Sequence, residues 1–302
     1  MTITIIPDIH ADLNRLGISL RLAELRGARP AYLGDFIDAG KVLTGDAADR
    51  EVLQRVRKQI DADTATAVLG NHELNAILYH RKGSGGTPLR AHSAPNAKQH
   101  RSFVNAFGAG TDDARYWTDW FLEALPLWHE GDGFRLVHAC WSDPEIELVR
   151  ARRPDGRLRP EDLPEVANKT TDFAKAVERL VSGAEVGLPN GFHFMDGAGN
   201  MRNHVRLRWW GDGRSWREMA LSVPADATLP DGEISQGIAP AAYPNAAPPV
   251  FVGHYKMAGE PKLEHPRVAS LDYPLSPCVY HWGGEPVLST DNLNLLDWPG
   301  ED

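Results

Sequence analysis

Cysteine is scarce in this sequence, and long apolar runs are missing from it. The 302 residues include only Cys140 and Cys278, too few for a disulfide framework or a cysteine-rich zinc site. No apolar stretch approaches the roughly 18 residues that span a bilayer, so an integral membrane protein is not expected. The opening residues, MTITIIPDIH, have no basic start and no small-residue cleavage site, which predicts no signal peptide. Together these absences predict a cytoplasmic protein that does not bind membranes.

Positive charge is also in short supply. The chain has 32 lysines and arginines against 41 aspartates and glutamates, a net charge of −9. Long nucleic acid is therefore not an expected partner, because binding to its phosphate backbone requires a basic face. Hydrophobic residues make up 42% of the chain and charged residues 24%, so an ordinary packed core can form. For this length we expect one α/β domain over residues 1–302, with insertions.

Short β-branched runs alternate with amphipathic stretches in the N-terminal part of the chain. Strands are predicted at 3–6, 31–33 and 65–69, and helices at 13–26 and 51–60. This β-α-β-α-β order indicates a parallel sheet that binds its ligands where the strands end. Further strands are predicted at 134–137, 250–252, 268–271, 278–282 and 287–288.

Two long regions interrupt this alternation. Residues 74–128 are mostly helical in pattern, so we expect a helical insertion that covers one side of the site; its aromatic run at 116–121 is expected to pack in the core. Irregular insertions are expected over about 150–249. This region contains a basic, proline-rich segment at 150–164 and a segment rich in Pro, Ala, Gly and Asp at 222–249.

A polar cluster follows each of five predicted strands. The clusters are Asp8-Ile9-His10, Gly34-Asp35-Phe36-Ile37-Asp38, Gly70-Asn71-His72-Glu73, His138 and Gly253-His254. Oxygen and nitrogen ligands without thiolate suit Mn²⁺, Fe or Zn²⁺ and do not suit a soft metal. One metal that also holds water rarely needs so many protein ligands, whereas two metals sharing a carboxylate do, and such a pair suits in-line attack on phosphorus.

Each of these residues also has a plainer explanation. A lone aspartate at a strand end, such as Asp8, is usually a helix cap or a turn former. Asn71 and His72 alone could form an ordinary turn, and Asp38 alone could be a solvated loop acid. All of these explanations would have to hold at once at successive strand ends, so we favour a metal site.

In their order, the five motifs resemble those of the calcineurin-like metallophosphoesterases. The resemblance is strongest to the phosphoprotein-phosphatase branch and its bacterial diadenosine tetraphosphatase-like relatives. The matching motifs are DIH at 8–10, GDFIDAG at 34–40, GNHE at 70–73, VHA at 137–139 and GH at 253–254. The resemblance covers residues 1 to about 140; beyond them only the pair Gly253-His254 matches. It implies a four-layer α/β/β/α sandwich and a metal-dependent hydrolase of phosphate esters.

The resemblance also implies a role for each matching residue. The implied ligands are Asp8, His10 and Asp35 for the first metal, with Asp35 bridging, and Asn71, His138 and His254 to complete the second. His72 would protonate the leaving oxygen, and Asp38 would hold His72 and favour its charged form. The implied reaction is attack by a metal-bridging hydroxide on a phosphomonoester, with two divalent ions at a dinuclear centre. Mn²⁺ is the first choice, and Fe or Zn²⁺ are the alternatives.

One position departs from the family pattern. The phosphoprotein-phosphatase branch usually has a phosphate-gripping arginine where this chain has Ala39. The alternating segment at 206–210 would place Arg206 and Arg208 on one strand face, and phosphate favours the guanidinium fork, so both are candidate substrate-binding residues. The alternative is a surface strand over packed tryptophans. The arginines at 150–159 are expected to form a solvated basic loop.

Two other functions stay open at this point. The first is hydrolysis of a dinucleoside polyphosphate or another nucleotide, and the second is a catalytically dead metal-binding scaffold that recruits partners. The expected partner is a small phosphorylated substrate or nucleotide, with a phosphoprotein as a further candidate. Histidines outside the motifs are expected to be surface or structural residues; they are His80, His92, His100, His129, His193, His204, His265 and His281.

Overall fold

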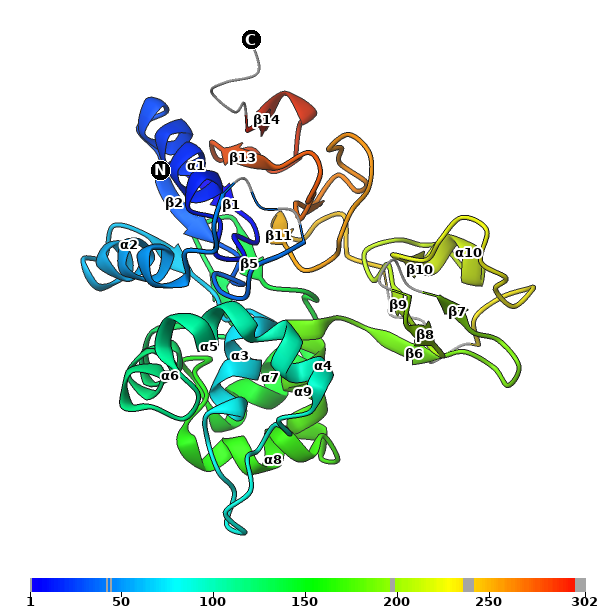
Figure 1. Ribbon diagram of the computed structural model, residues 1–302. Coiled ribbons are helices and arrows are strands. Elements are labelled where there is room, and N and C mark those ends of the chain that lie inside the picture. The colour runs from blue at the N-terminus through cyan, green and yellow to red at the C-terminus, as the bar shows by residue number, and fades with distance from the viewer. Residues whose placement is uncertain (1, 42, 44, 196–198, 236–241, 297–302) are drawn as a thin grey trace.

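Two β-sheets packed face to face carry the polar clusters in the computed structural model (Figure 1). The structure describes residues 2–41, 43, 45–195, 199–235 and 242–296. The first sheet has five strands in the order β14-β13-β1-β2-β3. Its strands are β1 (Ile3–Ile6), β2 (Arg29–Tyr32), β3 (Thr66–Ala67), β13 (Cys278–Trp282) and β14 (Leu293–Leu295). Because β1, β2 and β3 are parallel, their carboxyl ends lie at one edge of the sheet.

The second sheet has the strand order β12-β11-β5-β4. Its strands are β4 (Trp128–Glu130), β5 (Arg135–Val137), β11 (Val250–Val252) and β12 (Val268–Ser270). Strands β5, β11 and β12 are parallel, and every residue of β11 and β12 is buried. Strands buried on both faces are typical of a sheet that is covered on both sides.

Alternation along the strands divides the core into layers. Ile5 of β1 and Phe251 of β11 belong to the cluster between the two sheets. The next residues along the chain, Ile6 and Val252, point the other way and pack in the cluster that includes the helices. The layers therefore follow the order helices, sheet, sheet, helices, which confirms the predicted α/β/β/α sandwich.

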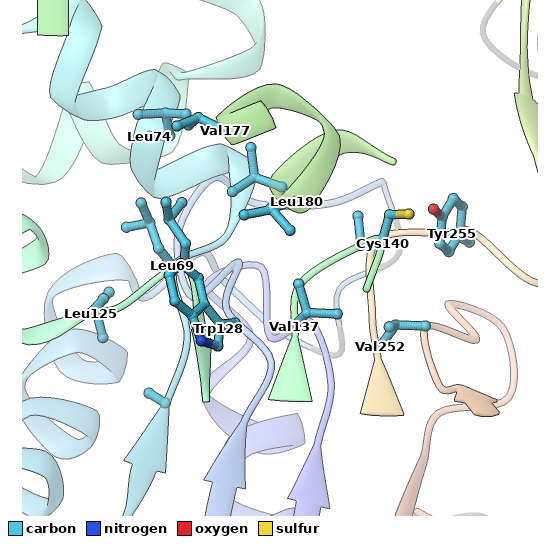
Figure 2. Packing of buried hydrophobic residues seen from close by; sticks show 14 of the residues in the cluster. Leu69, Leu74, Leu125, Trp128, Val137, Cys140, Val177, Leu180, Val252 and Tyr255 are labelled. Carbon is cyan, nitrogen blue, oxygen red and sulfur yellow. The ribbon is translucent and has the colours of Figure 1, made fainter. Parts of the chain in front are cut away.

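Helices cover the outer faces of both sheets. On the first sheet lie α1 (Leu13–Leu25) and α2 (Asp49–Asp61), and on the other side of the molecule lie α7 (Asp143–Arg152), α8 (Leu163–Asn168) and α9 (Asp172–Ser182) (Figure 1). Figure 2 shows Val177 and Leu180 of α9 in the same cluster as Val137 of β5. In the described part of the chain, no helix is both long and apolar enough to cross a membrane.

The segment expected to be a helical insertion contains four helices. They are α3 (Asn71–Tyr79), α4 (Ala94–Gln99), α5 (Arg101–Phe107) and α6 (Asp112–Ala124). The aromatic run packs on the core side of α6, where Trp117, Trp120 and Phe121 are buried while Tyr116 is exposed.

The segment at 150–249 is more regular than predicted. The expected loop at 150–164 is confirmed only over 153–159; residues 150–152 end α7, and residues 160–164 belong to η1 (Pro160–Asp162) and the start of α8. Its arginines pair with nearby acids, as in Arg152–Glu165 at 2.7 Å and Arg153–Asp162 at 2.7 Å. These ion pairs hold the basic segment against the helices that follow it.

The described residues from β6 to β10 form a small lobe beside the sandwich (Figure 1). Its elements are β6 (Glu185–Gly187), β7 (Phe194–Met195), β8 (Met201–Arg202), β9 (His204–Leu207), α10 (Trp216–Met219) and β10 (Ala220–Leu221). Two other expectations were wrong in detail. Strand β9 ends at Leu207 and does not continue through 210, and no strand forms at 287–288, since Val287 is exposed and the edge strand is β14.

Candidate metal centre and active site

The six predicted metal ligands meet at the edge where strands of both sheets end. They are Asp8 and His10 after β1, Asp35 after β2, Asn71 after β3, His138 after β5 and His254 after β11. All except Asn71 are buried, with exposed fractions of 8% or less. Asp8 is not the helix cap of the plainer explanation, because the side chain of Asp12 caps α1.

Asp35 lies at the centre of this group. Its Oδ1 is 3.4 Å from Nε2 of His138, and its Oδ2 is 4.0 Å from Nε2 of His10. Among the residues that the structure describes, two sets of ligand atoms, each within 4.8 Å of one another, could hold a metal ion, and both include Asp35. One set adds Asp8 and His138, and the other adds His10 and His72. Asp35 therefore has the position that a carboxylate bridging two ions would need.

The imidazole rings are oriented as metal ligands usually are. Nδ1 of His138 donates to the carbonyl of Leu33 at 2.6 Å, and Nδ1 of His10 donates to the carbonyl of Ile37 at 3.3 Å. A backbone carbonyl that takes the Nδ1 proton leaves the Nε2 lone pair free for a cation. In both residues Nε2 faces the carboxylate of Asp35.

A cation would also satisfy acceptor groups that crowd together at this edge. Oδ1 of Asn71 lies 3.0 Å from Nε2 of His138, which has already given its Nδ1 proton to Leu33. Nε2 of His254 is buried without a hydrogen-bond partner among the described residues. An orphaned nitrogen and facing acceptors are the features expected of a metal site, so the donor set fits divalent cations.

The pKa values of three ligands are shifted. Burial lowers the pKa of His138, but the charge of Asp35 and the hydrogen bond to it outweigh burial and raise that pKa to about 10, so a cation at Nε2 of His138 would replace a proton there. Burial, together with the charges of Asp272 and Asp35, raises the pKa of Asp8 well above its ordinary value. Burial and the charge of His72 lower the pKa of His10 to about 3, so His10 is neutral and able to act as a ligand. A bound divalent cation would reverse the repulsion between the carboxylates.

The backbone is strained at this site. Residues His10, Asp35, Asp38 and His254 all have positive φ values, of 50°, 52°, 64° and 64°. Each such conformation in a residue other than glycine carries a strain of about 1–3 kcal/mol and is found mainly at functional sites. Four of the eight described non-glycine residues with positive φ are therefore residues that the motifs predict for the site.

Glu73 holds two of the clusters together, a role that the sequence analysis did not assign. Its buried carboxylate accepts from the backbone N–H groups of Asp35 and Phe36 at 2.8 Å and from that of Gly70 at 3.2 Å. The turn that carries Asp35 is thereby attached to the start of α3, where Asn71 lies. The GNHE motif was the available signal, since it places Glu73 at the third position of that helix.

Gly253 gives the Asp8 carboxylate the space it occupies. A Cβ atom at this position would collide with Oδ1 of Asp8. We expect Gly253→Ala to displace Asp8 and lower metal affinity or activity by at least about tenfold while the fold is kept. Elemental analysis and phosphatase assays would measure this. The matched control is Gly283→Ala, whose Cβ would meet only Glu285 at 3.6 Å. Equal behaviour of the two variants would contradict this account.

His72 and Asp38 form a close pair beside the metal ligands. Nδ1 of His72 lies 2.8 Å from Oδ2 of Asp38, and its Nε2 lies 3.9 Å from Oδ2 of Asp35. Burial lowers the pKa of His72, but the charges of Asp35 and Asp38 and the hydrogen bond to Asp38 outweigh it and raise the pKa to about 9. This shift favours the protonated ring at neutral pH, and Nε2 is directed toward the site.

His100 is a second residue that the sequence analysis missed. It was expected to be a surface or structural histidine, but its Nδ1 lies 2.7 Å from Oδ1 of Asp38. No local pattern indicated this contact, because His100 comes from the helical insertion and follows no strand.

A cavity of about 600 Å³ opens over the ligands. Its floor includes Asp8, His10, Asp35, Asn71, His72 and His254. Its walls carry the cationic residues Lys41, Arg202, Arg206 and Lys256, and also Phe194. The structure thus brings Arg206 to the site. It does not bring Arg208 there: β9 ends before Arg208, which instead lies 3.5 Å from Glu264 in an ion pair.

Comparisons with known proteins agree with this geometry at the level of the family. A model of the calcineurin-like phosphoesterase family matches residues 1–212. A solved metallophosphoesterase from Sphaerobacter thermophilus is 26% identical, with a TM-score of 0.30, and the match spans 46% of this chain and only 46% of that protein. A putative diadenosine tetraphosphatase is 14% identical over 99% of this chain and 95% of its own, with a TM-score of 0.44.

A cold-active protein-tyrosine phosphatase from a psychrophilic Shewanella species is 12% identical over 98% of this chain and 80% of its own, with a TM-score of 0.45. No curated protein matches this chain significantly.

Proposed function

Because this chain belongs to the calcineurin-like phosphoesterases, a metal-dependent family, we propose that it hydrolyses a phosphomonoester with two divalent metal ions. The observation that carries the proposal is the position of Asp35, which is shared by both sets of candidate ligand atoms. Mn²⁺ is the first choice of metal, with Fe or Zn²⁺ as alternatives, because the ligands are oxygen and nitrogen atoms.

The chain supplies a complete set of ligands for this chemistry. Following the family motifs, Asp8, His10 and Asp35 would hold one ion, and Asp35, Asn71, His138 and His254 would hold the other. This division differs from the two sets of neighbouring ligand atoms, in which Asp8 lies with His138 and His10 lies with His72; only Asp35 has the same place in both. When bound, two such cations would lower the pKa of water and stabilise negative charge on the phosphoryl oxygens.

The residues around the ligands would handle the proton and the phosphate. His72 holds a proton on Nε2, beside the ligands, and would give it to the leaving oxygen. Asp38 orients the ring through Nδ1 and stabilises its charged form. Arg206, on the cavity wall, would bind the phosphoryl oxygens. It would replace the arginine that the phosphoprotein-phosphatase branch usually has at the position of Ala39.

The role of Arg206 can be tested with a neighbour as control. We expect Arg206→Ala to weaken inhibition by inorganic phosphate by about tenfold, because a hydrogen bond to a charged group contributes about 1.5–3 kcal/mol. Arg208→Ala should leave that inhibition unchanged, since Arg208 pairs with Glu264 outside the cavity. Equal phosphate inhibition in the Arg206 variant and the wild type would show that the metals or Lys256 bind the phosphate instead.

The cavity favours a dinucleoside polyphosphate or another nucleotide as a second candidate substrate. A phosphomonoester needs little room beyond the metals, whereas this cavity measures about 600 Å³. Its four cationic residues could contact several phosphate groups, and Phe194 offers an aromatic face for a base.

Turnover assays separate the candidate functions. The metal-loaded protein would be given p-nitrophenyl phosphate, sugar phosphates, nucleotides, dinucleoside polyphosphates and phosphopeptides, and the products measured. Preferred release of inorganic phosphate from monoesters supports the proposal, and preferred cleavage of dinucleoside polyphosphates favours the second candidate. An absence of turnover on every substrate would favour a metal-binding scaffold.

A further inference from the structure

A chain of hydrogen bonds runs from His72 away from the cavity into the helical insertion. Asp38 accepts from His72 with Oδ2 and contacts Nδ1 of His100 with Oδ1, at 2.8 and 2.7 Å. Nε2 of His100 lies 3.0 Å from Nε2 of His80. The chain ends at the backbone N–H of Gly110, which lies 3.1 Å from Nδ1 of His80.

The last contact fixes the direction of the others. A backbone N–H can only donate, so Nδ1 of His80 accepts. A neutral ring that accepts at Nδ1 carries its proton on Nε2, so His80 donates to Nε2 of His100. His100 then carries its own proton on Nδ1 and donates it to Oδ1 of Asp38.

We propose that His100 is a positioning residue that acts on His72 through Asp38. It gives one carboxylate oxygen of Asp38 a fixed donor, so that the other oxygen faces Nδ1 of His72 and Nε2 of His72 stays turned toward the metal ligands. This role rests on the proposed function, in which His72 protonates the leaving oxygen.

The surroundings of Asp38 explain why its carboxylate needs the hydrogen bond from His100. Asp38 is buried in a strained conformation with φ of 64°, and its backbone N–H donates to Asp49 at 2.9 Å. His100 is held in turn, since its ring stacks on Phe103 with a centroid separation of 4.7 Å.

His80 is suited to be the neutral end of the chain. It is buried, and burial lowers the pKa of His80 to about 4. A neutral His80 can donate from only one nitrogen, which keeps the direction of the chain fixed.

The hydrogen-bond direction can be tested on the wild-type protein without any activity assay. Long-range ¹H–¹⁵N correlation spectra of histidine-labelled protein distinguish the two neutral tautomers of each ring. We expect His80 to carry its proton on Nε2 and His100 to carry its proton on Nδ1, with peaks assigned by single substitutions. The opposite tautomer in His100 would overturn the proposal.

Substitutions at His100 test the effect on His72. His100→Asn keeps an amide group near the place of Nδ1, whereas His100→Leu removes the donor. We expect His100→Leu to slow alkyl phosphates by about tenfold or more, and p-nitrophenyl phosphate by less than about twofold, because only the poor leaving group needs the acid. His100→Asn should restore most of the alkyl phosphatase activity.

His92 offers a matched control in the same insertion. Its ring stacks on Tyr79 at 3.7 Å and donates to the carbonyl of Tyr79, outside the chain of hydrogen bonds. His92→Leu should leave the ratio of alkyl to p-nitrophenyl rates unchanged.

The outcomes separate this proposal from the proposed function. Equal slowing of both substrates by His100→Leu, with no rescue in His100→Asn, would show a purely structural role and overturn the proposal. If His100→Leu does not fold, two measurements still test the proposal. They are the tautomers in the wild-type protein and the ratio of alkyl to p-nitrophenyl phosphate rates in His100→Asn. A wild-type protein without any phosphatase activity would contradict the proposed function instead, and the tautomers alone would then decide the hydrogen-bond chain.

Discussion

Asp35→Asn is expected to remove metal from the protein more completely than any other single ligand change. Asp35 is the one residue in both sets of candidate ligand atoms, so the loss of its charge weakens both sites at once. Activity should fall by about 10²- to 10³-fold or more, the range seen when one preorganised charge-stabilising group is lost. Elemental analysis of the purified variant would measure the metal content, and steady-state assays would measure the activity.

Asp8→Asn is the matched control, because it makes the same chemical change at a residue in only one of the two sets. It should retain more metal than Asp35→Asn. Removal of metal by EDTA should abolish activity in the wild type, and Mn²⁺ should restore at least part of it. If Asp35→Asn keeps two metals per chain and normal activity, the Asp35 carboxylate does not bridge two metal ions.

His72→Asn should keep both metals and slow alkyl phosphates far more than p-nitrophenyl phosphate. An alkoxide leaves poorly without a proton, whereas p-nitrophenolate leaves well unaided. General acid catalysis contributes about 10²–10⁴-fold, so its loss should be plain on the poorer leaving group. Asp38→Asn should show the same pattern more mildly, because the ring is then less firmly held and less readily charged.

Rates over aryl and alkyl phosphates of graded leaving-group pKa would measure this difference. The wild-type rate on alkyl phosphates should also fall as the pH rises through the pKa of His72, since only the protonated ring can act as the acid. The rate on p-nitrophenyl phosphate should be less affected. Equal slowing of all substrates in His72→Asn would mean that His72 binds phosphate or orients a ligand, and is not the acid.

The sequence predicted that the side chains of the candidate ligands would gather at one edge of the sheets, because the signal for this is local. Each ligand directly follows a short apolar strand, and parallel strands bring their carboxyl ends to one edge whatever the loops between them do. The elements β1 and β13 have the predicted bounds for the same reason, since both are apolar runs between clear breaks.

The contact between Asp38 and His100 could not be predicted in this way. It joins residues 62 positions apart, and it depends on how α4 and α5 pack against the turn after β2. Arg208 shows a related limit, because alternation predicts a shared face only as far as the strand continues, and β9 ends one residue earlier.

The prolines of the segment at 150–164 predict a loop, which is correct for only part of the segment. Pro154 lies in the loop at 153–159, but Pro160 and Pro164 lie in the first turns of η1 and α8. Proline is tolerated there because the N–H groups of a first turn have no partner within the helix. A proline next to acidic residues can therefore indicate the start of a helix as well as a break.

The position of β1 inside its sheet has a consequence for how the protein is made. β1 pairs with β2 on one side and with β13 on the other, so β1 keeps an unpaired edge until residues 278–282 have been synthesised. Contacts this distant in sequence form slowly, and unpaired strand edges promote aggregation in the meantime. Asp8 accepts from the backbone N–H of His254, 246 positions away, so the candidate metal site cannot be complete before His254 has been synthesised. A nascent or truncated chain without its C-terminal strands would expose this edge to the cell's chaperones and could not yet assemble its full set of ligands.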